Sequence, residues 1–181
     1  MKKILLILLS VCLLLTLVSC GEKEEPPKEH KYSMKYENGG AAMYFEGEKL
    51  FEIPADALAA IKLVESEYSS VQYDERLSDK DRADIVGIIF AAELKMSPVS
   101  DEDRAKFEDK YSYNNLLNLR RLSVSLADGG ELFIGVYNDG SVWITAPDGN
   151  VYATDTKTVN RDKVEEIILD SEDTEQEENT Q

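Results

Sequence analysis

The sequence is poor in the residues on which many enzymes depend for nucleophilic and metal chemistry. Its 181 residues include one histidine and two cysteines. Histidine is the usual base beside a catalytic serine or cysteine, and both residue types are frequent ligands of transition metals. His30, the single histidine, lies in a charged segment and is interpreted as a solvated linker residue. We therefore expect a protein without catalytic residues, metal site or cofactor.

Positive charge is also scarce. The chain has 20 Lys+Arg against 36 Asp+Glu, a formal net charge of −16. Phosphate groups repel so acidic a chain, which excludes nucleic acid as a partner and favours a basic protein. The acids at Asp79, Asp81 and Asp84 lack the glycine and closing glutamate of an EF-hand calcium loop. They are better explained by the start of a helix.

A long apolar run occurs at the N-terminus. After the basic start at Lys2 and Lys3, residues 4–18 are apolar except for Ser10, Cys12 and Thr16. This run is shorter than the roughly 20 residues that a membrane-spanning helix needs. A short basic start followed by such a run predicts a secretory signal peptide over residues 1–19.

The end of the run, Leu17-Val18-Ser19-Cys20, resembles the lipobox of bacterial lipoproteins. The resemblance covers residues 1–20 and implies attachment of a diacylglyceryl group to the Cys20 thiol, followed by cleavage between Ser19 and Cys20. Two or more acyl chains hold a protein stably on a bilayer, whereas one holds it weakly. The resemblance therefore implies a lipid anchor on Cys20 at the extracytoplasmic face of the cell membrane. Because Cys12 leaves with the signal peptide, the folded part has no thiol.

Composition divides the remaining chain into three parts. Residues 20–32 are acidic, lack large apolar side chains before Tyr32, and predict a flexible tether. Residues 170–181 contain many acids and no Lys or Arg, which predicts a disordered acidic tail. This tail either keeps the protein soluble or docks a basic partner. We expect a single α+β domain over residues 33–169.

Three Asp-Gly turns define the C-terminal half of this domain: Asp128-Gly129, Asp139-Gly140 and Asp148-Gly149. Each suits a type I turn followed by a glycine with positive φ. The turns predict a four-stranded antiparallel meander over about 121–155, packed on helices, with short strands N-terminal to it. The register that they set places three apolar pairs on one face: Leu122 with Ile134, Val124 with Leu132, and Val136 with Val142.

Helix signals occur on both sides of the meander. Ser78 with Asp81 resembles a capping box, and the apolar spacing after it predicts a helix that Pro98 ends. Its apolar positions are Ile85, Ile88, Ile89, Ala92 and Met96. Ser100 with Asp103 predicts a shorter helix that carries Phe107 and Tyr111. Asn160 can cap a third helix whose inward residues are Val164, Ile167 and Ile168.

The N-terminal part shows strand signals. Residues 34–37, 42–45 and 50–53 predict short strands, with a turn at Asn38-Gly39-Gly40. The segment from Pro54 to Tyr68 has two interpretations. It is a continuous helix that buries Leu58, Ile61 and Val64, or its first half is a helix and its second half a strand. We favour the continuous helix.

The second face of the meander carries the candidate binding residues. One cross-strand row is Arg121, Gly135, Trp143 and Ala153, so the single tryptophan lies between two small residues and Arg121 can stack on it. Phe133 and Tyr137 share this face. Exposed aromatic clusters favour recognition of a protein, peptide or sugar. Alternatively, the N-terminal strands or a helix cover this face and Trp143 belongs to the core.

These observations favour a non-catalytic role. We expect an envelope lipoprotein that binds or modulates another envelope protein, with a sensor of cell-wall sugar or peptide through the Trp143 face as the alternative. A small hydrolase is a third hypothesis, since the abundant carboxylates can supply an acid–base pair. The overall plan is similar to that of small Gram-positive-type lipoproteins, a resemblance that implies no activity.

Overall fold

The structure is a computed structural model that describes residues 30–67, 70–74, 76–110, 119–154 and 158–178. Its strands are β1 (Tyr32–Glu37), β2 (Gly40–Phe45), β3 (Glu48–Ile53), β4 (Lys62–Glu67), β5 (Ser70–Asp74), β6 (Leu94–Pro98), β7 (Leu119–Ser125), β8 (Glu131–Tyr137), β9 (Val142–Thr145) and β10 (Val151–Thr154). Its helices are α2 (Ala55–Ala59), α3 (Asp79–Ile89), α4 (Asp101–Lys110) and α5 (Arg161–Glu178). The predicted signal peptide, Cys20 and most of the predicted tether lie outside the described residues.

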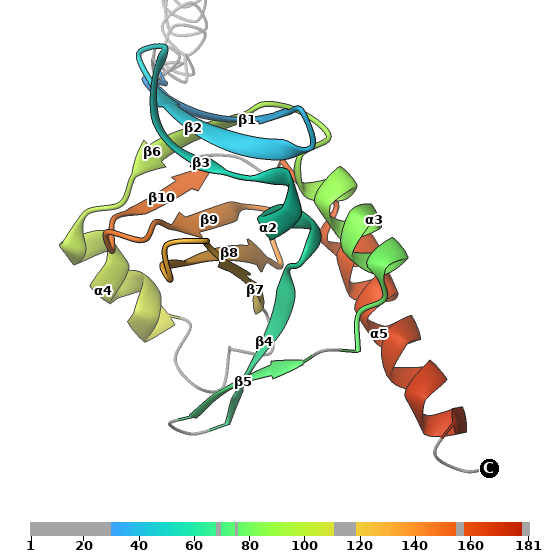
Figure 1. Cartoon of the computed structure of the whole chain (residues 1–181). Coiled ribbons are helices and arrows are strands. Elements are labelled where there is room, and N and C mark those ends of the chain that lie inside the picture. The colour runs from blue at the N-terminus through green and yellow to red at the C-terminus, as the bar shows by residue number, and fades with distance from the viewer. Residues whose placement is uncertain (1–29, 68–69, 75, 111–118, 155–157, 179–181) are drawn as a thin grey trace, which may run out of the picture.

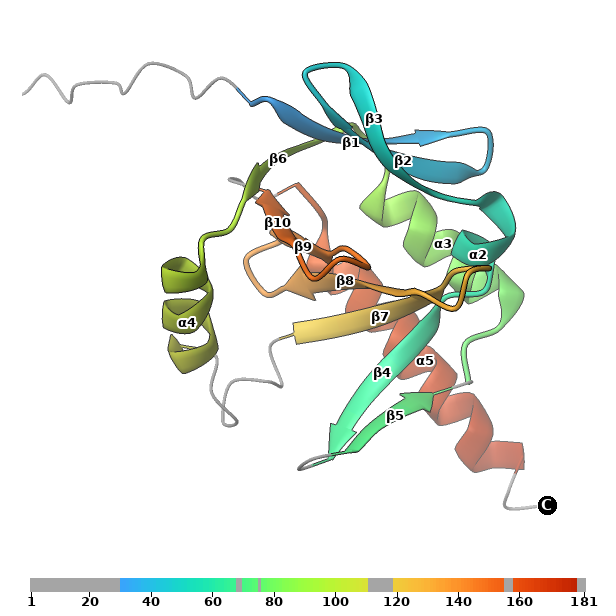
Figure 2. The same ribbon diagram turned by 60° about the vertical axis from the view of Figure 1, so that its left-hand side comes forward.

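Within this part of the chain, all ten strands belong to one antiparallel sheet in the order β3-β2-β1-β6-β10-β9-β8-β7-β4-β5. The sheet curls around the core like half a barrel (Figure 1, Figure 2). The described chain starts beside β1, and α5 runs away from that end toward the opposite side (Figure 1).

The fold class expected from the sequence is wrong. The meander exists as β7 to β10, but it is the middle of a larger sheet. Strands β6, β1, β2 and β3 continue the sheet beyond β10, while β4 and β5 continue it beyond β7. The fold is therefore dominated by its sheet, and the described helices are a minor part of it rather than the layer on which a small meander rests.

Two predicted helices contain a strand instead. The helix expected to reach Pro98 ends at Ile89, and β6 follows, with Leu94 and Met96 buried and Lys95 exposed between them. This alternation has the period of a strand. Likewise, α2 ends at Ala59 and β4 begins at Lys62, so the continuous helix was wrong and the alternative with a strand was correct.

The Asp-Gly turns share one geometry. The three glycines, Gly129, Gly140 and Gly149, have φ of 84°, 79° and 85°. In each turn the aspartate accepts a hydrogen bond from the backbone N–H two residues later, at 2.9, 2.9 and 3.0 Å. These bonds fix the turns, and the strands pair in the predicted register: Leu122 with Ile134, Val124 with Leu132, and Val136 with Val142. This register prediction is confirmed.

The first hairpin also confirms its prediction. Asn38 and Gly39 have φ of 53° and 84°, as the tight turn between β1 and β2 requires. At Gly40 a Cβ atom would lie 2.4 Å from the carbonyl oxygen of Ile53, so only glycine lets the two chain segments approach this closely. The three predicted N-terminal strands lie within β1, β2 and β3.

Helices α3 and α5 lie side by side along the sheet (Figure 1, Figure 2). Ser78 and Asp81 form the predicted capping box of α3, and Ser100 accepts a bond from the Asp103 N–H at 3.1 Å at the start of α4. Helix α5 buries Val164 and Ile168 as predicted, and it continues to Glu178 through much of the segment expected to be a disordered tail. The predicted contacts of Phe107 and Tyr111 lie outside the described side chains.

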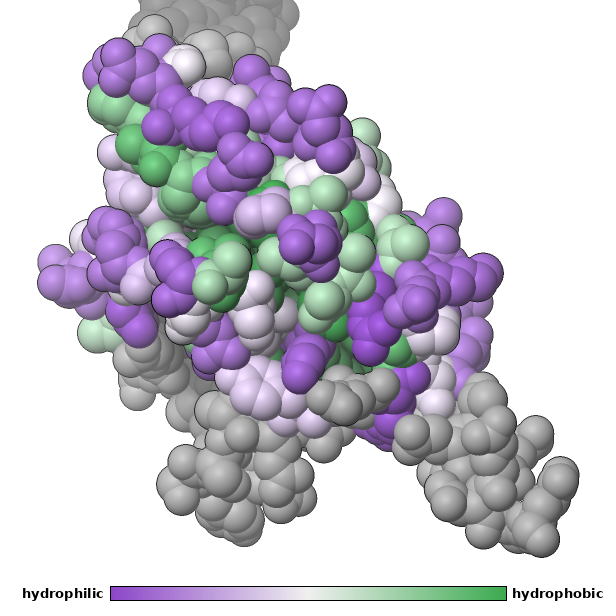
Figure 3. All heavy atoms as spheres, in the orientation of Figure 1, coloured by the Kyte–Doolittle hydropathy of each residue, from purple (hydrophilic) through white to green (hydrophobic). Residues whose placement is uncertain are grey.

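The core is one cluster on the inner face of the sheet. It joins apolar residues of the meander, such as Ile134 and Ile144, to Met34 and Met43 at one end of the sheet and to Ile85 of α3. In the view of Figure 3, hydrophilic residues occupy the periphery, and hydrophobic residues gather toward the middle, where Figure 1 shows β8 to β10 and α2. The inner face of the sheet thus holds the fold together.

Candidate binding surface

The structure brings the four predicted binding residues together. Arg121 pairs with Gly135, Gly135 pairs with Trp143, and Trp143 pairs with Ala153, so the predicted cross-strand row is confirmed. Because side chains alternate along a strand, Phe133 and Tyr137 point to the same side of β8 as Gly135. We call the surface formed by Arg121, Phe133, Tyr137 and Trp143 the outer face.

The side chains of the outer face form two pairs. The guanidinium carbon of Arg121 lies 3.8 Å from the centroid of the Phe133 ring. The rings of Tyr137 and Trp143 have centroids 5.6 Å apart and are tilted by 58°. The expected partner of Arg121 was Trp143, but Phe133 takes this place because it is the diagonal neighbour on the adjacent strand. Trp143 is two strands away from Arg121.

The outer face is partly covered. Arg121, Phe133 and Trp143 are half-buried, and Tyr137 is 6% exposed. The sequence left two interpretations open, an exposed aromatic platform and a covered face with Trp143 in the core. The structure lies between them, because Trp143 is half-buried. Partial burial restrains the side chains and leaves part of each in contact with solvent.

A polar group that the sequence analysis missed adjoins the aromatic residues. Glu131 accepts hydrogen bonds from Ser123 Oγ, at 2.6 Å, and from the hydroxyl of Tyr73. The bonds from Ser123 and Tyr73 lower the pKa of Glu131, and the same carboxylate raises the pKa of Tyr73. Strand alternation could have placed Ser123 and Glu131 here. Tyr73 could not have been found, because β5 carried no recognised strand signal.

Burial sets the electrostatics of Arg121. Loss of hydration lowers the pKa of this guanidinium, and the charge of Arg104 on α4 acts in the same direction. Tyr137, Glu131 and Tyr73 act in the opposite direction. Among the described residues, Arg121 forms no ion pair with a carboxylate. The outer face therefore holds a restrained cation that forms no ion pair in the described part of the chain.

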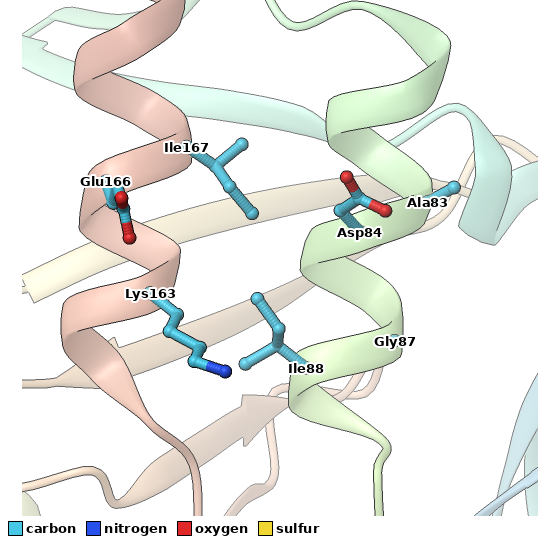
Figure 4. A pocket seen from close by; sticks show the side chains of 7 residues that line it. All are labelled: Ala83, Asp84, Gly87, Ile88, Lys163, Glu166 and Ile167. Atoms are coloured by element: carbon cyan, nitrogen blue, oxygen red, sulfur yellow. The ribbon is translucent and has the colours of Figure 1, made fainter.

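A separate feature is an open groove between α3 and α5, with a volume of about 450 Å³. Ile88 and Ile167 extend into it from opposite helices (Figure 4). The lining is completed by Ala83, Asp84, Gly87, Lys163 and Glu166. This groove lies on the helical side of the protein, and none of the four binding residues predicted from the sequence lines it.

A metal site and a membrane-spanning helix are two further features that the described residues could provide. In this part of the chain, no three His, Cys, Asp or Glu residues are placed so that they could hold a metal ion. No helix within it has the length and apolar character needed to cross a bilayer. No protein-family model, curated protein or solved structure matches the chain. The geometry of the outer face is therefore the observation that bears on function.

Proposed function

We propose that this chain is a lipid-anchored extracytoplasmic protein that binds another envelope protein through its outer face and does not itself catalyse a reaction. The observation that carries the proposal is the pairing of Arg121 with Phe133 and of Tyr137 with Trp143 on three adjacent strands. Arginine, tyrosine and tryptophan are the residues that most often dominate the energetics of protein interfaces.

The scaffold supports this role. Strands β7, β8 and β9 are joined by tight turns, and their inner faces bury Leu122, Ile134 and Ile144. A side chain that is held in place before binding loses little conformational entropy when the partner arrives. The outer face is therefore suited to recognition, because most of its ordering cost is met when the chain folds.

The anchor part of the proposal rests on the lipobox resemblance at Cys20. Replacing Cys20 by alanine removes the sulfur that accepts the lipid, and we expect Cys20→Ala to leave the membrane fraction. Cys12→Ala is the matched control, since Cys12 lies within the predicted signal peptide and should not affect anchoring. Membrane fractionation with mass measurement of the mature N-terminus checks both variants. A Cys20→Ala protein that stays membrane-bound to the wild-type extent would refute the anchor.

The binding part is tested by chemical crosslinking in intact cells, followed by purification of the lipidated chain. We expect the wild type to crosslink one envelope protein and Trp143→Ala to lose it, because the indole is half-buried on the contact surface. Leu169→Ala is the matched control: Leu169 is 45% exposed on α5, away from β9. Equal crosslinking by wild type and Trp143→Ala, or no crosslinked protein with either, would argue against this function.

A further inference from the structure

Arg121 is the outer-face residue whose charge has no ion-pair partner among the described residues. Its guanidinium stacks on Phe133 and is half-buried, but among the described residues it has no ion pair. This is unexpected in a chain with 36 Asp+Glu against 20 Lys+Arg. Its neighbour Arg120 shows the alternative, because it donates two hydrogen bonds to the carboxylate of Glu165.

The carboxylate that acts on Arg121 from the same face is engaged elsewhere. Glu131 raises the pKa of Arg121 through its charge, yet its Oε1 atom accepts the hydroxyl hydrogen bonds of Ser123 and Tyr73. Arg104 adds a second positive charge near Arg121. The result is a cation that is partly withdrawn from water and that forms no ion pair with an acid in the part of the chain that the structure describes.

The stacking geometry determines which donors remain. A phenyl ring over the flat face of a guanidinium covers that face and leaves the in-plane N–H groups free to donate. A planar carboxylate matches these donors and can accept two parallel hydrogen bonds. Trp143 lies on the same face, beyond Gly135 in the same cross-strand row, and offers an apolar surface two strands away from the charge.

Building on the proposed function, we propose that Arg121 binds a carboxylate of the partner protein, an Asp or Glu side chain that lies next to an apolar residue packed against Trp143. The contact is local. The net charge of −16 favours a partner that is basic overall, whereas this position of the interface requires an acid. An acidic residue within a basic partner satisfies both conditions and gives the interface its register.

The test uses the full-length lipidated chain in detergent micelles, where Trp143, as the only tryptophan, reports on the outer face by fluorescence. The probes are two neutral-capped dipeptides, acetyl-Leu-Glu-amide and acetyl-Leu-Gln-amide, which differ in the carboxylate alone. We expect the Glu peptide to bind about tenfold more tightly, the range expected for hydrogen bonds to a charged group.

Three variants separate the role of Arg121 from general effects. Arg121→Gln should abolish the preference for the Glu peptide, and Arg121→Lys should retain a part of it, because lysine keeps the charge and loses the planar donors. Lys80→Gln removes one positive charge from α3, where Lys80 pairs with Asp84, and should leave the preference unchanged. The peptide comparison on the wild type does not depend on the folding of any variant.

The outcomes distinguish this inference from the proposed function. Equal affinity for the two peptides, or an unchanged preference in Arg121→Gln, would overturn the carboxylate site. Displacement of the Glu peptide by inorganic phosphate at equal ionic strength would also overturn it, because the site would then be a general anion site. In each case the crosslinking experiment decides separately whether the outer face binds a protein.

Discussion

Arg120 and Arg121 are adjacent in β7 but lie on opposite faces of the sheet. Arg120 Nε donates a hydrogen bond to Oε2 of Glu165 on α5 at 2.6 Å, and Arg120 Nη2 donates one to Oε1 of the same residue. Arg161 forms an ion pair with this carboxylate at 3.0 Å. Arg121 stacks on Phe133 and has no ion pair among the described residues. One arginine thus joins the sheet to a helix, whereas the other contacts an aromatic ring of its own sheet.

The two faces also differ in how folding shifts the pKa of their charged groups. The hydrogen bond from Arg120 and the charges of Arg120 and Arg161 lower the pKa of Glu165, which means that the folded protein favours the ionised pair. At Arg121, burial lowers the pKa, which means that the folded protein disfavours the charge. Folding therefore favours the charges of the pair at Glu165, whereas burial opposes the charge of Arg121.

The largest expected difference in the free energy of unfolding is between substitutions at two adjacent residues of β8. Ile134 is 1% exposed on the inner face, so Ile134→Ala should lower the free energy of unfolding by about 3 kcal/mol through lost burial and the cavity left behind. Phe133→Ala on the outer face should cost less than half of this, about 1 kcal/mol. Urea unfolding followed by far-ultraviolet circular dichroism measures both. Equal losses would mean that the outer face is part of the core.

A smaller effect is expected from the ion pair on the helical side. Glu165→Gln leaves Arg120 and Arg161 without an ionised partner, and because these side chains are partly exposed, the loss should be about 1–2 kcal/mol. Glu166→Gln is the matched control at the next position, which is exposed and should change the free energy of unfolding by less than about 0.5 kcal/mol. A similar loss in both variants would contradict the assigned role of Glu165.

The smallest effect is a pH dependence. Since the folded pKa of Glu165 is below the unfolded value of about 4.3, its contribution is complete above that pH and is lost as pH falls through the folded pKa. The difference in free energy of unfolding between wild type and Glu165→Gln should therefore shrink from pH 5 to pH 3. Denaturant titrations at several pH values in this window measure it. A constant difference would show that ionisation of Glu165 is not the source.

Local sequence signals predicted the meander well. The Asp-Gly turns determine their own geometry, and the turn lengths fix the register, so the row from Arg121 through Gly135 to Trp143 followed from counting residues. The strands outside the meander were harder. Strand β4 pairs with β7 through Lys62 and Leu63, partners far away in the sequence, and no local pattern reveals such a contact.

The details of the outer face show the same limit. Alternation along β7, β8 and β9 identified which residues share the face, but not which side chains touch. Arg121 stacks on Phe133 because of a diagonal contact between strands, and Glu131 binds Tyr73 from a strand that was not predicted. Contacts of this kind depend on how the sheet is assembled and twisted, which a single sequence does not display.

Comparing the free energies of unfolding of Arg120→Gln and Arg121→Gln tests whether Arg121 serves binding and not folding. We expect a loss of about 1–2 kcal/mol for Arg120→Gln, which breaks the contact with Glu165. For Arg121→Gln we expect a value within about 0.5 kcal/mol of wild type. A loss in Arg121→Gln as large as that in Arg120→Gln would mean that Arg121 serves the fold.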